Sequence, residues 1–120
     1  MKAFNVRVAI VHPGIIDTAM ARRISVDSAT SNYPQERRFS GLFTESLKTP
    51  ASPSIVADKI LEVATGNDWQ FRHPVGPDAV PFLEWRKAMT DEQWAEWGAL
   101  SDDDWYASVE ADFGLDARQG

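Results

Sequence analysis

The chain contains no cysteine among its 120 residues. Disulfide bonds, cysteine-zinc sites and thiolate catalysis are therefore excluded, and the composition fits a reducing cytoplasm. Its longest uninterrupted apolar run, Val8–Val11, is far shorter than the roughly 20 residues that a membrane-spanning helix needs. The N-terminal segment lacks the apolar stretch and cleavage site of a secretory signal. We therefore expect a cytoplasmic protein with no membrane partner.

Positive charge is scarce near the C-terminus. The net charge is −6, and residues 1–88 contribute +2 of it, from eleven Lys/Arg against nine Asp/Glu. Residues 89–120 contribute −8, from one Arg against nine Asp/Glu. Nucleic acids and anionic lipids are bound through cations that neutralise their phosphates. We therefore expect no nucleic-acid partner.

Two segments have the composition of buried strands. Asn5–Val11 is rich in β-branched residues and apolar on both faces after Arg7, which is typical of a strand covered on both sides in a parallel sheet. His12-Pro13-Gly14 is expected to end it. Trp69–Val75 is the second predicted strand. A long connection between two such strands predicts a right-handed parallel crossover unit.

The connection between these strands is predicted to hold one well-marked helix. Residues 19–52 read as mostly irregular, with short helices near Ala19–Ile24 and Pro34–Phe43, and a connection of this length is commonly a functional lid. Ser52 is a good N-cap, Pro53 suits the first helical position and Gly66 suits the end. The apolar face of this helix is predicted to contain Val56, Ile60, Val63 and Ala64.

The C-terminal third is predicted to be helical. We expect helices over Pro81–Met89, after Thr90 (a capping box with Gln93) and after Ser101, whose following aspartates favour a helix N-terminus. Tryptophans at helical spacing in this region favour packing in a core or an interface over stacking on bases. His12 and His73 each lack neighbours at metal-ligand spacing, so satisfied or exposed histidines are favoured over a metal site.

The most informative segment for function is Val6–Thr18. In open parallel sheets, ligands bind beyond the carboxyl ends of the strands. The loop after the first strand offers two isoleucines, backbone amides and one hydroxyl, which suit a flat heteroaromatic ligand bearing an amide. A plain strand-to-loop turn is the alternative interpretation.

Three motifs, at Phe4–Val8, Pro13–Thr18 and Arg72–Ala79, resemble segments of the short-chain dehydrogenase/reductase family. Pro13–Thr18 (PGIIDT) is similar to the Pro-Gly-x-x-x-Thr segment after the sixth strand of that family. Phe4–Val8 resembles the entry into the same strand, and Arg72–Ala79 resembles the seventh strand and the turn after it. The helix over residues 52–65 lies at the matching distance between them. The resemblance covers residues 1–80, and His12 departs from it, since many members carry an acidic residue there.

The resemblance implies roles for individual residues. The backbone of Ile16 and the hydroxyl of Thr18 would hold the carboxamide of the nicotinamide of NAD or NADP, above a turn shaped by Pro13 and Gly14. Residues 20–43 would form a flexible cover over a small carbonyl or alcohol substrate. The candidate apolar contacts in this cover are Met20, Tyr33 and Phe39, for which ordinary packing or exposure is the alternative.

Two elements of the family are missing from the sequence. No two glycines lie close enough for the Gly-rich turn that holds the cofactor diphosphate. Tyr-x-x-x-Lys, in which the lysine lowers the pKa of a proton-transferring tyrosine, is also missing, since Arg37 follows Tyr33 and Glu110 follows Tyr106 at that spacing. We therefore expect the chain to hold no catalytic residue, to correspond to the C-terminal part of such an enzyme and to be inactive alone.

The expected fold class is α/β. Residues 1–80 would form the C-terminal portion of a Rossmann-type doubly wound parallel sheet, with two parallel strands and a crossover helix, and residues 81–120 an acidic Trp-rich helical tail. We expect an isolated ladder of this kind to fold poorly or associate, and the family suggests homo-oligomers formed partly through residues 52–75. Two alternatives are a non-enzymatic interaction module, using the Trp-rich acidic helices, and an unrelated small α/β domain.

Overall fold

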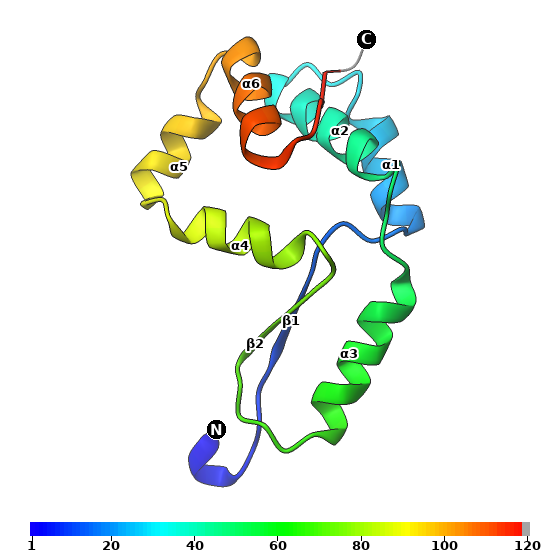
Figure 1. The fold of residues 1–120 in the computed structure, drawn as a ribbon, viewed down its shortest axis with the longest axis vertical. Helices are drawn as coiled ribbons and strands as arrows, with labels where there is room; N and C mark the ends of the chain where they lie inside the picture. The colour runs from blue at the N-terminus through cyan, green and yellow to red at the C-terminus, as the bar shows by residue number, and fades with distance from the viewer. Residues whose placement is uncertain (119–120) are drawn as a thin grey trace.

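Two short parallel strands and six α-helices form the fold, which a computed structural model describes for residues 1–118 (Figure 1). Along the chain the elements are the 3₁₀ helix η1 (Lys2–Phe4), β1 (Ile10–Pro13), α1 (Ala19–Asp27), α2 (Pro34–Ser46), α3 (Pro53–Thr65), β2 (Arg72–Val75), α4 (Ala79–Lys87), α5 (Asp91–Gly98) and α6 (Asp102–Phe113). The prediction of a mixed α/β chain is confirmed.

The two strands pair in parallel, as the sequence predicted, with α3 in the connection between them. Ile10 lies opposite Arg72, and Pro13 lies opposite Val75. The ladder continues past Pro13, because the N–H of Gly14 donates to the carbonyl of Val75 over 2.9 Å. Since N–H groups alternate between the two edges of a strand, the missing N–H of Pro13 falls on the edge away from β2. The strand itself ends at Pro13, within the predicted stop at His12–Gly14, so that expectation is confirmed.

The prediction that the first strand is covered on both sides is wrong. The strand begins at Ile10 instead of Asn5, and the second strand begins at Arg72 instead of Trp69. The side chains of Val6, Val8 and Ile10 are 41%, 51% and 37% exposed. Their composition suits burial, but a sheet of two strands does not supply enough neighbouring surface to bury them.

The segment between β1 and α3 is more helical than expected. α1 continues to Asp27 and α2 continues to Ser46, so the prediction of a mostly irregular connection is wrong. Both starts agree with the sequence: Thr18 caps α1 by accepting from the N–H of Ala21, and Pro34 begins α2. The two helices pack against each other.

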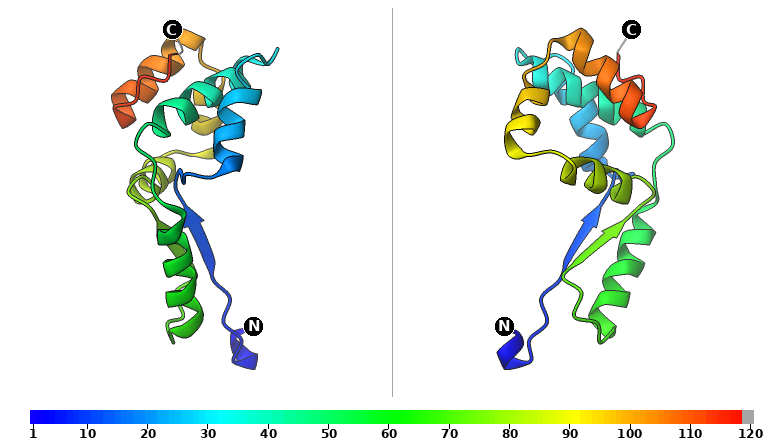
Figure 2. Two further views of the ribbon diagram at one scale, coloured as in Figure 1. Left: turned by 90° about the vertical axis from the view of Figure 1, so that its right-hand side faces the viewer. Right: turned by 60° about the vertical axis from the view of Figure 1, so that its left-hand side comes forward.

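Helix α3 runs beside both strands, whereas α1, α2, α4, α5 and α6 gather beyond the carboxyl ends of the strands (Figure 2). Ser52 caps α3 by accepting from the N–H of Ser54, as predicted. At its other end, the guanidinium of Arg7 donates to the carbonyls of Val63 and Ala64, each over 3.1 Å. Carbonyls in the last turn of a helix have no partner within the helix. Arg7 satisfies two of them and thereby attaches the segment that precedes β1 to the end of α3.

The C-terminal helices follow the predicted signals. The capping box of Thr90 and Gln93 begins α5, and Ser101 caps α6 by accepting from the N–H of Asp104. Trp105 and Val109 on α6 are almost fully buried and form the main core cluster with Ala117. α4 begins at Ala79, two residues earlier than predicted. Pro81 is then the third residue of the helix, where an N–H has no partner within the helix.

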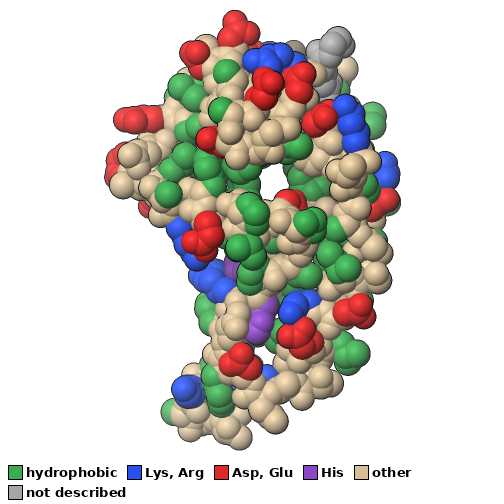
Figure 3. Space-filling view, in the orientation of Figure 1, with side chains coloured by type: hydrophobic (Ala, Val, Ile, Leu, Met, Phe, Trp, Pro, Cys, Tyr) green, Lys and Arg blue, Asp and Glu red, His purple; other side chains and the backbone are tan. Residues whose placement is uncertain are grey.

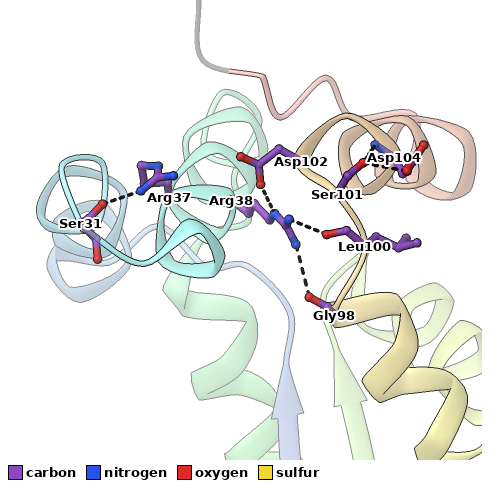
Figure 4. Close-up of polar contacts among 8 residues, drawn as sticks. All are labelled: Ser31, Arg37, Arg38, Gly98, Leu100, Ser101, Asp102 and Asp104. Atoms are coloured by element: carbon purple, nitrogen blue, oxygen red, sulfur yellow. Dashed lines mark hydrogen bonds and ion pairs between the residues drawn. The ribbon is translucent and has the colours of Figure 1, made fainter.

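A buried arginine joins this C-terminal core to α2 (Figure 4). Arg38 is 5% exposed and donates from Nε to Asp102 over 2.7 Å. Its two terminal nitrogens donate to the carbonyls of Leu100 over 2.7 Å and Gly98 over 3.3 Å. All of these partners lie at the α5–α6 junction, so one side chain holds α2 against it.

The molecule is extended for its length. Its radius of gyration is 16.7 Å, against about 14 Å for a compact domain of this length. Its surface of 8075 Å² exceeds the roughly 6,500 Å² expected for its mass. Much of this excess reflects the strands and α3, which project from the helical part (Figure 1).

Candidate functional site

The turn after β1 is held in place by a carboxylate from the segment between β2 and α4, which is distant in the sequence but adjacent in space. Asp78, which precedes α4, accepts from the backbone N–H of Ile15 through Oδ2 over 2.7 Å. Gly14 permits this contact, since a Cβ atom there would lie 1.9 Å from Oδ1 of Asp78. A residue with any side chain at position 14 would displace the carboxylate.

Further along the same turn, Ile16 forms a parallel bridge to Ala51, which precedes α3. The N–H of Asp17 donates to the carbonyl of Ala51 over 3.0 Å. Consecutive residues of an extended segment direct their backbone groups to opposite edges, so the N–H and carbonyl of Ile16 point away from Ala51. Its side chain is 8% exposed and anchors the turn. The backbone of Ile16 is therefore a donor and an acceptor that do not pair with Ala51.

Thr18 and Asp17 end the turn at the N-terminus of α1. The hydroxyl oxygen of Thr18 accepts from the N–H of Ala21 over 3.1 Å, which leaves its hydrogen free to be donated. Asp17 accepts from Nε of Arg22 over 2.6 Å. This hydrogen bond from Arg22 lowers the pKa of the Asp17 carboxyl, and the positive charge of Arg22 adds to the effect.

An apolar pocket with a volume of about 420 Å³ adjoins the turn. Pro13, Gly14 and Ile15 line it on the side of β1. The aromatic and aliphatic side chains opposite come from α2, α4 and α6, and include Phe39, Leu42, Phe43, Phe82, Leu83 and Phe113. Figure 3 shows an opening through the molecule between the regions that Figure 1 labels α2 and α4, with hydrophobic side chains along much of its rim and an acidic side chain at its lower edge. The volume lies within the range of small-molecule sites.

The residues predicted to form the site are not all brought together. Pro13, Gly14 and Phe39 line the pocket, whereas Ile16 and Thr18 lie further along the turn. Met20 and Tyr33 are exposed, at 65% and 67%, and do not line the pocket.

Sequence reasoning missed two polar residues of the pocket, Asp78 and Ser46. Oδ1 of Asp78 and Oγ of Ser46 are buried without a hydrogen-bond partner within the described chain, and both residues line the pocket. Asp78 lies after a glycine and a proline that follow a strand, which is a turn signal but gives no sign of a contact with Ile15, 63 residues away.

The tryptophans of the C-terminal helices, Trp85, Trp94, Trp97 and Trp105, pack into one cluster. Ring centroids lie 5.1 Å apart for Trp85 and Trp97, 5.8 Å for Trp85 and Trp94, and 5.3 Å for Trp97 and Trp105. The prediction that these residues pack together is therefore confirmed.

The histidines are hydrogen-bonded to neighbouring groups. His12 contacts Arg72 over 3.1 Å, and His73 contacts the carbonyl of Gln70 over 2.9 Å. Within residues 1–118, no group of three or more His, Cys, Asp or Glu side chains could hold a metal ion. None of the helices in that same part of the chain is long and apolar enough to cross a bilayer.

Comparison with known proteins found no protein-family model, no curated protein and no solved structure that matches this chain.

Proposed function

We propose that this chain is the C-terminal part of an oxidoreductase similar to the short-chain dehydrogenases/reductases, with a Rossmann-type sheet in the whole enzyme. The reaction would be hydride transfer between NAD or NADP and a carbonyl or alcohol. In this proposal the turn Pro13–Thr18 binds the nicotinamide end of the cofactor, and α2 contributes to the substrate cover.

The backbone of Ile16 is the observation that carries the proposal. A carboxamide has one acceptor oxygen and one donor NH₂, and needs a donor and an acceptor in return. The N–H and carbonyl of Ile16 point away from the bridge to Ala51 and would supply both. The free hydrogen of the Thr18 hydroxyl supplies a second donor at the end of the same turn.

The arrangement of the strands supports this assignment. The parallel pairing of β1 with β2 places the turn beyond their carboxyl ends, where open parallel sheets bind ligands. The bound nicotinamide would supply the hydride chemistry. The residues of this chain would hold the carboxamide and thereby orient the ring, while the apolar pocket beside Pro13 and Ile15 would exclude water.

The proposal assigns no proton transfer to this chain. Neither Tyr33 nor Tyr106 is followed by a lysine at the required spacing, and the sequence has no Gly-rich turn for a diphosphate. We expect the chain to bind the nicotinamide end weakly and to show no turnover by itself.

The alternative of an interaction module has less support from the packing. Trp85, Trp94, Trp97 and Trp105 pack on one another, so part of their ring surface is already used within the chain.

The test divides the cofactor into its two halves. Saturation-transfer NMR on the folded chain uses reduced nicotinamide riboside as one probe and ADP-ribose as the other. We expect transfer to the protons of the nicotinamide ring, with shifts of the amide resonances of Ile16 and Thr18, and no transfer to ADP-ribose. Equal transfer to both probes, or none to the riboside when circular dichroism shows a folded chain, would overturn the proposal.

Variants of Thr18 locate the binding. Thr18→Asp keeps a capping acceptor for α1 but removes the hydrogen-bond donor, so we expect binding of the uncharged riboside to weaken about fivefold, as for one lost hydrogen bond. Thr18→Ser keeps both the cap and the donor and serves as the matched control, with binding unchanged.

A further inference from the structure

The apolar pocket is lined mainly by uncharged side chains. Phe39, Leu42 and Phe43 of α2 face Phe82 and Leu83 of α4 across it. The rings of Phe82 and Phe113 lie 5.7 Å apart and are stacked, so the wall formed by α4 and α6 is continuous. Such a surface favours an apolar group of a ligand, because burial removes that group from water.

Asp78 is the one acidic residue among the described residues that line this pocket, and no Lys or Arg accompanies it there. Oδ2 is held by the N–H of Ile15, and Oδ1 is buried with no hydrogen-bond partner. The structure contains no ion pair between Asp78 and any described cation. The groups that face this negative charge are therefore backbone groups: the N–H of Ile15 and the N-terminus of α4, which Asp78 precedes.

Part of the lining comes from the acidic C-terminal segment. Phe113 and Leu115, which line the pocket, belong to residues 89–120, the part of the sequence with a net charge of −8. An anionic ligand would lose its hydration on entering and would meet the like charge of Asp78. No Lys or Arg lines the described pocket, although the guanidinium of Arg72 contacts the lining residue His12 over 3.1 Å.

We infer that this pocket binds the uncharged, hydrophobic part of a ligand and rejects anions. The inference rests on the proposed function in one respect: if the chain serves an oxidoreductase, its substrate is a hydrophobic aldehyde, ketone or alcohol. Keto acids, phosphorylated sugars and acyl phosphates are excluded. Binding to the pocket itself requires no cofactor.

Three probes of nearly equal shape test the inference. They are 4-phenyl-2-butanone, which is neutral, 3-phenylpropionate, which replaces the methyl group by a charged oxygen, and 4-phenyl-2-butylamine, which is cationic. Binding is measured on the full chain by titration calorimetry and by the shifts of the Gly14 and Ile15 amide resonances. We expect the ketone to bind at least about tenfold more tightly than the acid, because the acid places like charges together. The amine should bind more tightly than the acid.

Two variants assign the effect to Asp78 and to this pocket. Asp78→Asn keeps an acceptor for the N–H of Ile15 but removes the charge, so affinity for the acid should rise severalfold while affinity for the ketone changes little. Leu83→Trp fills the pocket and should abolish binding of all three probes. Asp58→Asn, at an exposed position of α3 outside the pocket, is the matched control and should leave the order of affinities unchanged.

The outcomes separate this inference from the proposed function. The inference is overturned if the ketone and the acid bind with equal affinity, or if the amine binds as weakly as the acid. It is also overturned if Asp78→Asn leaves the affinity for the acid unchanged, or if a folded chain does not bind the ketone. If the ketone is preferred but nicotinamide riboside does not bind, the proposed function fails and the pocket's preference stands. If Asp78→Asn does not fold, the ranking of the three probes on the unmodified chain still decides.

Discussion

At position 14, a side chain would begin where the carboxylate of Asp78 lies. The two residues are far apart in the sequence, and their contact sets the path of the turn that leaves β1. Gly76 lies close to the same carboxylate, with φ at +108°, a conformation that other residues rarely adopt. The conformation of this corner therefore depends on two glycines and one carboxylate.

Gly14→Ala is expected to lower the free energy of unfolding by roughly 1–3 kcal/mol, the usual cost of overpacking. The new Cβ atom would lie 1.9 Å from Oδ1 of Asp78 and force it aside. In an Asp78→Ala background the same change should cost almost nothing, because the clash is gone. Urea unfolding of the four proteins of this double-mutant cycle measures the coupling.

Gly98→Ala is the matched control for this cycle. A Cβ atom at Gly98, the last residue of α5, would meet nothing within 4 Å. We expect no loss of stability and a gain of up to about 1 kcal/mol from reduced chain entropy. If both glycine variants cost the same, the contact between Gly14 and Asp78 is not what constrains the turn.

Asp17 provides a prediction about pH. Its pKa lies below the ordinary value of 3.8 because it accepts a hydrogen bond from Arg22. A carboxyl whose pKa is lowered by folding stabilises the folded state above its unfolded pKa, and this contribution is lost as the pH falls through the folded pKa. We therefore expect the start of α1 to loosen only in acid. Carboxyl-carbon NMR should give a midpoint below 3.8, and Arg22→Gln should return it toward 3.8; an unchanged midpoint in the variant contradicts this cause.

At the scale of helices and strands, sequence and structure agree best where the signal is local. Ser52, Thr90 and Ser101 cap the helices they were predicted to begin, because a cap is a contact between residues two or three apart. The limits of β1 and β2 were less predictable. The sequence around each strand favours β-structure over a longer segment than the strand itself. Only the residues that pair across the ladder adopt the strand conformation.

The predicted site shows the same division. The turn after β1 could be inferred from Pro13 and Gly14, which are local signals. The roles of Asp78 and Ser46 could not, since they depend on α2 and α4 meeting the turn in space. Helical spacing also predicted an apolar face of α3, but Ile60 on that face is 52% exposed. Periodicity indicates which residues prefer burial and does not supply the surface that would bury them.

Arg38 is the residue on which the placement of α2 depends. Arg38→Met should lower the free energy of unfolding by about 2–3 kcal/mol, because two backbone carbonyls and Asp102 lose their charged donor. Arg37→Met, on the same helix, removes one hydrogen bond to the carbonyl of Ser31 and should cost about 1 kcal/mol or less. Urea unfolding followed by tryptophan fluorescence compares them, and equal costs would contradict the role of Arg38.

At the scale of the whole molecule, the amount of exposed apolar surface is the main feature. The strands and α3 leave Val8, Ile60 and Phe71 at least 46% exposed, and the outer edge of β1 has no neighbouring strand within the described residues. Unpaired edges with β-branched residues favour pairing between molecules.

We therefore expect the isolated chain to associate as its concentration rises, as seen by light scattering and sedimentation velocity. Val8→Lys should reduce this association, since it places a charge in the exposed segment that leads into β1, and a lysine beside a strand edge opposes pairing. Val26→Lys changes an equally apolar residue, 69% exposed on α1, and should have little effect. A monomer at every concentration, or an equal effect of both lysines, would contradict association through the edge of β1.

The ladder between β1 and β2 also has a kinetic consequence. It joins segments about sixty residues apart through four residue pairs, and closing a loop of that length costs about 3–4 kcal/mol of chain entropy. The core around Trp105 is built mainly from residues 97–117, with Leu42 added from α2, so most of its contacts need no such closure. The strands are therefore the last part of the chain to assemble and the first to separate, and their amide hydrogens should exchange with solvent well before those around Trp105.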